Sequence, residues 1–132
     1  MTPVLLDTTA WIDFLRPGTR VLGDTVRRLI EADRARICGA VVAELLRGVK
    51  GPGEQAQLSR LLGRIKRLET REDDWDAAGI KLKQLRESGI TVPLADALIA
   101  VVARRNGVPV LTADLHFRHL DVDLYTLDEP GV

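Results

Sequence analysis

The stretch VLLDTTAWIDFL, residues 4–15, decides the fold that we expect. Its start belongs to a short apolar run, PVLLD over residues 3–7, which is typical of a buried β-strand. The apolar residues Trp11 and Leu15 then lie four positions apart, which is the spacing of a helix. A strand that leads directly into a helix is the building unit of a parallel sheet. It also puts one carboxylate, Asp7, at the junction of the two elements.

The rest of the chain continues this alternation of strands and helices. We predict further strands over residues 35–40, 66–70, 108–114 and 122–127, and helices over residues 19–33, 41–50, 53–65, 71–89 and 92–107. Gly89 and Gly107 are expected to end the last two helices, and the helix over 92–107 is apolar nearly all round, which predicts that it is buried. The alternation implies an α/β fold with a mostly parallel sheet covered by helices on both faces, in three layers.

Composition predicts one domain over residues 1–132, because 45% of the residues are hydrophobic and a chain of this length can bury one core. Lysine plus arginine equals aspartate plus glutamate at 19 each, so binding of a polyanion such as RNA must depend on local sites. Apolar runs long enough to span a membrane and a secretory signal are both missing. With Cys38 as the only cysteine, these features predict a soluble protein of the reducing cytoplasm.

Four acids are predicted to meet at one edge of the sheet. In a parallel sheet, every strand delivers its carboxyl end to the same edge, and each returning helix starts there. Capping or turn formation explains most of these acids singly, but a carboxylate among apolar neighbours, as in VVAELL, needs a partner or a polar cleft. The four acids follow the first strand, lie in the helix after the second, open the helix before the fourth, and end the fourth: Asp7, Glu44, Asp96 and Asp114.

Carboxylates gathered in this way favour a divalent metal ion. Two carboxylates about 4 Å apart repel each other by about 4 kcal/mol at an effective dielectric constant near 20, and a cation removes that cost. The predicted site offers only oxygen ligands, which favours Mg²⁺ or Mn²⁺ over zinc. Such ions serve phosphodiester chemistry. The hydroxyls of Thr8, Thr9 and Thr112 can orient a carboxylate or water there, or can simply cap the backbone.

Four motifs together resemble the PIN-domain ribonucleases of the VapC toxin type: LLDTTAWIDFL, VVAELLRGV, PLADALIAVVA and VLTADLHF, which span Asp7 to Phe117. The resemblance implies a PIN-like fold whose central sheet has five strands in the order 3-2-1-4-5. It implies an Mg²⁺- or Mn²⁺-dependent endoribonuclease that hydrolyses structured RNA, such as tRNA or ribosomal RNA, with a metal-activated water. By the matching motifs, the metal-binding acidic quartet is Asp7, Glu44, Asp96 and Asp114, and Thr112 is an accessory catalytic residue.

The same resemblance implies homodimers and a VapB-type antitoxin as the partner that blocks the acidic cleft. Some relatives carry another acid just beyond the position of Asp114, where this chain reads LHF. The number of metal ions, one or two, is therefore open at this point.

Other readings of the same residues are kept open. The acids can belong to a metal-binding module without nuclease activity, to a phosphatase, or to a phosphoacceptor signalling domain, although the last wants a lysine near residues 122–127 and none is present. The acidic run EDDWD is explained by its place in the first turn of a helix. We interpret His116 and His119 as a partly exposed loop pair, and Arg16 and Arg47 as candidate phosphate contacts near the cleft.

Overall fold

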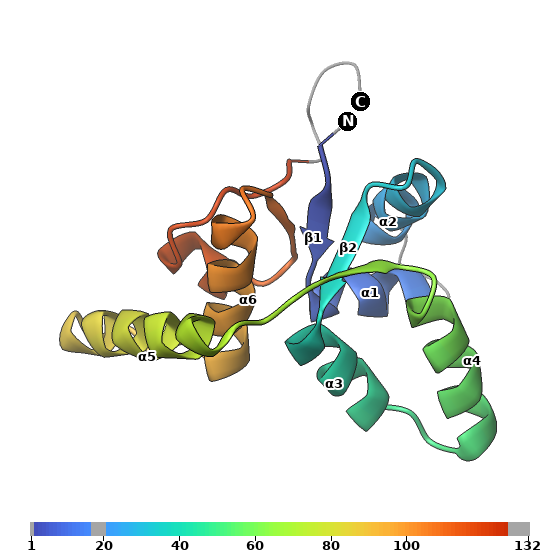
Figure 1. Ribbon diagram of the computed structural model, residues 1–132, viewed down its shortest axis with the longest axis horizontal. Coiled ribbons are helices and arrows are strands. Elements are labelled where there is room, and N and C mark those ends of the chain that lie inside the picture. Colours follow the sequence, from blue (N-terminus) through green and yellow to red (C-terminus); the bar gives the residue numbers. More distant parts are fainter. Residues whose placement is uncertain (1, 17–20, 127–132) are drawn as a thin grey trace.

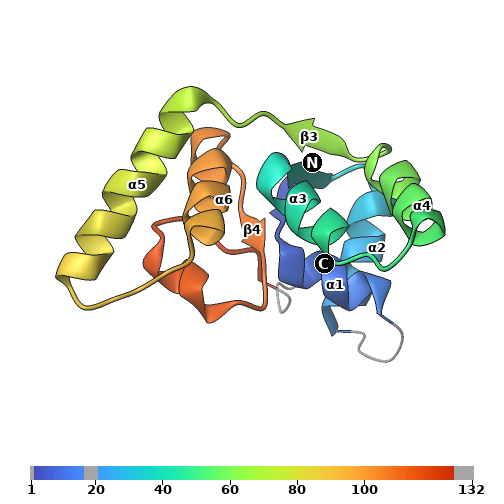
Figure 2. The same cartoon turned by 90° about the horizontal axis from the view of Figure 1, so that it is seen from below.

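A computed structural model describes residues 2–16 and 21–126 of the chain. The first two residues of the helix predicted over residues 19–33 and the last residue of the predicted fifth strand lie outside these residues. Four parallel strands form a sheet in the order β3-β2-β1-β4. The neighbours β1 and β2 are labelled in Figure 1, and β3 and β4 in Figure 2. The strands are β1 (Val4–Leu6), β2 (Ala35–Cys38), β3 (Lys66–Leu68) and β4 (Val110–Leu111).

Helices connect the strands as the sequence predicts. They are α1 (Thr8–Leu15), α2 (Val21–Glu31), α3 (Gly39–Arg47), α4 (Pro52–Leu62), α5 (Glu72–Glu87), α6 (Leu94–Arg105) and the short 3-10 helix η1 (Leu115–His119). Figure 2 shows α5 and α6 on one side of the sheet and α1, α2 and α4 on the other. The predicted three-layer α/β architecture with a parallel sheet is therefore confirmed.

The prediction of a full fifth strand over residues 122–127 is wrong for the residues described. The segment forms only an isolated parallel bridge between Val110 and Leu124. Two backbone hydrogen bonds support it: the Val110 N–H donates to the Asp123 carbonyl at 2.9 Å, and the Tyr125 N–H donates to the Val110 carbonyl at 2.8 Å. Since β4 itself has two residues, it offers little edge on which a longer strand could pair. The bridge nevertheless lies beyond β4, the position expected for strand 5.

Strand order fixes the place where a ligand can bind. The strand β1 pairs with β2 on one side and with β4 on the other. The chain thus adds β2 and β3 on one side of β1 and then crosses over to add β4 on the other side, so the strand order reverses at β1. In open α/β sheets, ligands bind at such a reversal, in the crevice outside the carboxyl ends of the strands. The carboxyl ends of β1 and β4 carry Asp7 and Thr112, respectively.

The core is apolar and includes the helix that the sequence marks as buried. Trp11, Phe117 and Ile37 are fully buried, and seven residues of α6 are buried, among them Asp96. Gly89 and Gly107 follow α5 and α6 as predicted. Both have positive φ angles, 81° and 65°, which glycine adopts without steric cost. Cys38 is buried as predicted.

A bidentate ion pair attaches α5 to α6. In Figure 1, α5 projects away from the sheet. Arg105 Nε donates to Asp74 Oδ1 at 2.8 Å and its Nη2 donates to Asp74 Oδ2 at 2.7 Å. The Arg71 N–H also donates to Asp74 Oδ2 at 2.8 Å. The hydrogen bonds from Arg105, above all, lower the pKa of Asp74. The acidic run EDDWD is therefore accounted for by a helix start and an interhelical ion pair. In the described part of the chain, every helix is too short or too polar to cross a membrane.

Candidate metal centre

Asp7 is held at the carboxyl end of β1 by three donors. Its residue surface is 2% exposed. Oδ1 accepts from the Thr9 hydroxyl at 2.7 Å and from the Ala10 N–H at 3.1 Å, so Asp7 is also the N-cap of α1. Oδ2 accepts from the Thr112 hydroxyl at 2.6 Å. Burial raises the pKa of Asp7, although these hydrogen bonds favour its charged form.

Thr112 connects the two strand ends. Its hydroxyl donates to Asp7 and accepts from the Asp114 N–H at 2.8 Å, so one side chain orients both acids. The Thr9 hydroxyl oxygen accepts from the Ala113 N–H at 2.9 Å and fixes the same loop to the start of α1. Hydrogen bonds between residues more than a hundred positions apart in sequence therefore join the loop after β4 to the loop after β1.

Asp96 lies beside Asp114 and has a strongly raised pKa. Asp96 lies in the first turn of α6 and its residue surface is 8% exposed. Burial, first of all, and then the hydrogen bond and the negative charge of Asp114 raise the pKa of Asp96 from 3.8 to about 7. The charge of Asp7 acts in the same direction. Within the described residues, the buried Oδ2 atom of Asp96 has no hydrogen-bond partner.

His116 lies against this pair, which the sequence interpretation missed. Its Nδ1 atom is 2.8 Å from Asp114 Oδ1 and 3.4 Å from Asp96 Oδ2. One donor atom from each of Asp96, Asp114 and His116 lies within 4.8 Å of the other two. The available signal was the spacing: an aspartate and the residue two positions later share one turn, so their side chains can meet. The described structure does not bring His119 into this cluster.

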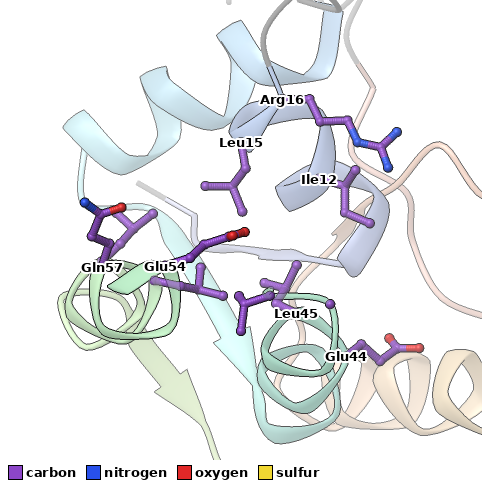
Figure 3. A pocket seen from close by; sticks show the side chains of 11 residues that line it. Ile12, Leu15, Arg16, Glu44, Leu45, Glu54 and Gln57 are labelled. Atoms are coloured by element: carbon purple, nitrogen blue, oxygen red, sulfur yellow. The ribbon is translucent and has the colours of Figure 1, made fainter. Parts of the chain in front are cut away.

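Glu44 approaches the site from α3 through a different contact. Its Oε1 atom accepts from the Thr8 hydroxyl at 2.5 Å, and Thr8 is the residue after Asp7. Figure 3 shows the Glu44 carboxylate pointing away from Leu45 and Glu54. Glu44 is not one of the three residues whose donor atoms cluster, and neither is Asp7. The structure thus brings all four predicted acids to one edge of the sheet, with Asp96 and Asp114 in closest association.

The donors present at this edge fit a divalent cation. They are carboxylate oxygens with one imidazole nitrogen, and the unpaired buried oxygen of Asp96 is the kind of atom that an ion would satisfy. Burial, first of all, and the negative charges of Asp114 and Asp7 raise the pKa of Asp96, and a cation beside these acids would offset that repulsion.

An apolar groove lies between α1, α3 and α4 (Figure 3). Its volume is about 480 Å³. Apolar side chains line most of it, including Ile12, Leu15 and Leu45, and Glu44 also belongs to its lining. Arg16, one of the two predicted phosphate contacts, lies on this groove, whereas the other, Arg47, does not line it. The groove therefore adjoins the acidic edge through Glu44.

Residues 4–123 match the family described as PIN domain. The chain belongs to the PIN-domain family. Ribonuclease VapC11 of Mycobacterium tuberculosis is 31% identical over 118 residues, which cover 86% of this chain and 88% of that protein.

Two solved structures show the same PIN fold at lower identity. FitAcB from Neisseria gonorrhoeae has a TM-score of 0.73 at 23% identity and covers 94% of this chain and 97% of its own. VapBC2 from Rickettsia felis, bound to a DNA fragment from the promoter, has a TM-score of 0.75 at 19% identity. The match covers 94% of this chain and 98% of that chain. The family match and the relation to VapC11 confirm the sequence-based assignment to the PIN domains of the VapC type, and the acids described above lie within the matched residues.

Proposed function

We propose that this PIN domain is a divalent-metal-dependent endoribonuclease of the VapC type, the toxin of a type II toxin–antitoxin module. The observation that carries the proposal is the pairing of Asp96 with Asp114 at the strand reversal, with a buried oxygen left unpaired. The relation to VapC11, which is described as a ribonuclease, supports RNA as the substrate. The match over residues 4–123 supports one domain for the chain.

The proposed catalytic residues are Asp7, Glu44, Asp96, Asp114 and Thr112. A bound Mg²⁺ or Mn²⁺ ion would neutralise charge on the phosphodiester and make a nearby water more acidic. The chain's own residues prepare the place for it. Asp96 and Asp114 would present carboxylate oxygens to the ion, and the Thr112 hydroxyl, which donates to Asp7 and accepts from the Asp114 N–H, orients the two residues with respect to each other.

Glu44 has a separate role in this proposal. The Thr8 hydroxyl occupies Oε1 of Glu44, which leaves its other oxygen to accept a hydrogen bond or a proton at the edge of the site. Because Thr8 begins α1 directly after Asp7, the position of Glu44 is coupled to that of Asp7. Glu44 is therefore proposed to orient water or to accept a proton beside the two paired acids.

Strand order separates this proposal from a phosphoacceptor signalling domain. Flavodoxin-like signalling domains have the order 2-1-3-4-5, in which the third strand lies next to the first. Here β4 lies next to β1, and β3 is at the far edge beyond β2. The acids that meet at the reversal therefore come from β4 and α6 instead of from a third strand, as the endoribonuclease proposal requires.

We also propose a VapB-type antitoxin as the partner, seated in the groove between α1, α3 and α4. Apolar side chains line most of the groove, which can therefore take the apolar face of an amphipathic helix. Since Glu44 lines it, a chain in this groove ends beside the acidic edge and can cover it. Structured RNA such as tRNA or ribosomal RNA as substrate, homodimer formation and action in the cytoplasm remain parts of the proposal.

Cleavage of labelled RNA with and without Mg²⁺ or Mn²⁺ tests the activity. Metal-dependent internal cuts are expected from the wild type and a loss of at least about a hundredfold from Asp96→Asn and Asp114→Asn. Asp24→Asn is the matched control, because Asp24 pairs with Arg27 on the surface of α2. Cleavage that needs no metal, or equal activity in all variants, would contradict the proposal.

A binding assay with a candidate VapB-type antitoxin, taken from a neighbouring reading frame, tests the groove. Leu15→Glu puts a charge in the groove and is expected to abolish binding while RNA cleavage persists. Leu124→Glu is the matched control, because Leu124 is 41% exposed and Leu15 is 42% exposed, yet Leu124 does not line the groove. If the two variants bind the antitoxin equally well, the groove is not its seat.

A further inference from the structure

His116 occupies a position from which it can bind an ion directly. Its side chain is 45% exposed, and its Nδ1 atom faces Asp114 Oδ1 at 2.8 Å and Asp96 Oδ2 at 3.4 Å. Neighbouring ligands around an octahedral ion with bonds of about 2.1 Å are about 3 Å apart. The two distances from His116 Nδ1, 2.8 Å and 3.4 Å, lie on either side of that value. One donor atom of each residue lies within 4.8 Å of the other two, so one ion can reach all three.

The backbone fixes this spacing. Asp114 is the N-cap of η1, and its Oδ1 atom accepts from the His116 N–H at 2.9 Å. The carboxylate and the ring therefore belong to one short turn, and their relative position does not depend on an ion pair between two mobile side chains. Asp96 is fixed independently because it is buried in the first turn of α6.

A hydrogen bond from His116 does not account for the whole arrangement. Asp96 Oδ2 is buried and lacks a hydrogen-bond partner among the described residues, although the imidazole nitrogen is only 3.4 Å away. A cation between the three donors would satisfy that oxygen together with the two atoms beside it. An imidazole is also the ligand type that transition metals accept more readily than Mg²⁺, which prefers oxygen ligands and retains several waters.

We propose that His116 is a nitrogen ligand of the metal centre, beside Asp96 and Asp114, and that it makes the centre select Mn²⁺ over Mg²⁺. The inference rests on the proposed function, because it concerns the ion of the same site. It goes beyond the sequence prediction, in which all ligands were oxygens and the two ions were equivalent. His116 thereby changes from a loop residue into a determinant of which metal the protein uses.

Electron spin echo envelope modulation of Mn²⁺ bound to the full chain tests the ligand directly. A coordinated imidazole gives ¹⁴N modulation, and the chain has 2 histidines, so the assignment needs only two variants. We expect ¹⁴N modulation in the wild type and in His119→Gln, and none in His116→Ala. The absence of ¹⁴N modulation from the wild type, or its persistence in His116→Ala, would overturn the proposal.

Titration calorimetry with Mn²⁺ alone and with Mg²⁺ alone tests the selectivity. His116→Ala is expected to weaken Mn²⁺ binding by about tenfold or more and Mg²⁺ binding by no more than about threefold. His116→Asn keeps a nitrogen donor that can reach Asp114 but removes the imidazole ligand, so we expect it to behave like His116→Ala. Wild-type affinities in His116→Asn, or equal losses for both ions, would show that His116 only orients Asp114.

These measurements are separable from the test of the proposed function. RNA cleavage without ¹⁴N modulation would remove the inference about His116 and leave the endoribonuclease in place. ¹⁴N modulation without RNA cleavage would leave His116 as a metal ligand and remove the endoribonuclease proposal. The melting temperature of metal-free His116→Ala is the folding control. It should equal that of the wild type, because the ring is half exposed and the hydrogen bond from the residue 116 backbone N–H to Asp114 remains.

Discussion

Replacement of Asp96 by asparagine should stabilise the metal-free protein. Burial and the neighbouring Asp114 raise the pKa of Asp96 from 3.8 to about 7, so the charged form is disfavoured in the folded state. At 1.36 kcal/mol per pH unit, this difference corresponds to at most about 4 kcal/mol. Asparagine is neutral at every pH and can still donate a hydrogen bond to Asp114, as protonated Asp96 does.

The sign of the pH dependence follows from proton binding. Between about pH 4 and pH 7, the unfolded chain has lost the Asp96 proton while the folded protein keeps it, so the free energy of unfolding falls as the pH rises. The stability that protonated Asp96 provides is fully present below pH 3.8 and is lost once the pH passes about 7. The advantage of Asp96→Asn over the wild type should therefore be below about 2 kcal/mol at pH 5 and approach about 4 kcal/mol at pH 8.

Urea denaturation in the presence of a chelator, at several pH values, measures this difference. Asp74→Asn is the matched control because Asp74 is also a buried aspartate, but its pKa is lowered by Arg105. That variant should be less stable than the wild type at pH 8. Saturating Mg²⁺ or Mn²⁺ should stabilise the wild type and not Asp96→Asn. The difference in the free energy of unfolding between the two proteins should therefore become smaller when the ion is added. The reasoning is refuted if metal-free Asp96→Asn is less stable at pH 8, or if its advantage is the same at every pH.

Two further predictions concern single contacts. Thr112→Val removes the hydroxyl that orients Asp7 and Asp114 and should weaken metal binding by about tenfold to a hundredfold in calorimetry. Thr112→Ser keeps the hydroxyl, and its affinity for metal should stay near that of the wild type. If Thr112→Val binds metal as tightly as the wild type, Thr112 does not orient the two acids. Arg105→Gln leaves buried Asp74 without its cation and should lower the free energy of unfolding by about 3 kcal/mol in urea, without changing the affinity for metal.

The sequence by itself determined the local elements of this protein. The apolar run before Asp7, the helical spacing after it and the glycines after α5 and α6 predict elements whose signals lie within a few neighbouring residues. The apolar character of most of α6 likewise predicts its burial, because a helix that is apolar nearly all round is stable only when it packs inside a core. The common carboxyl edge of a parallel sheet was enough to bring four acids together, since the alternation of strands and helices imposes it.

Only the tertiary structure decided how those acids are arranged. The order of the strands brings the end of β4 beside β1, and this lets Thr112 reach Asp7 across 105 positions of sequence. The orientation of α6 pairs Asp96 with Asp114, and the turn after β4 adds His116 to that pair. These contacts depend on how whole elements pack against one another. A local pattern of residues carries no information on that packing, so it could predict which side chains share an edge but not which of them touch.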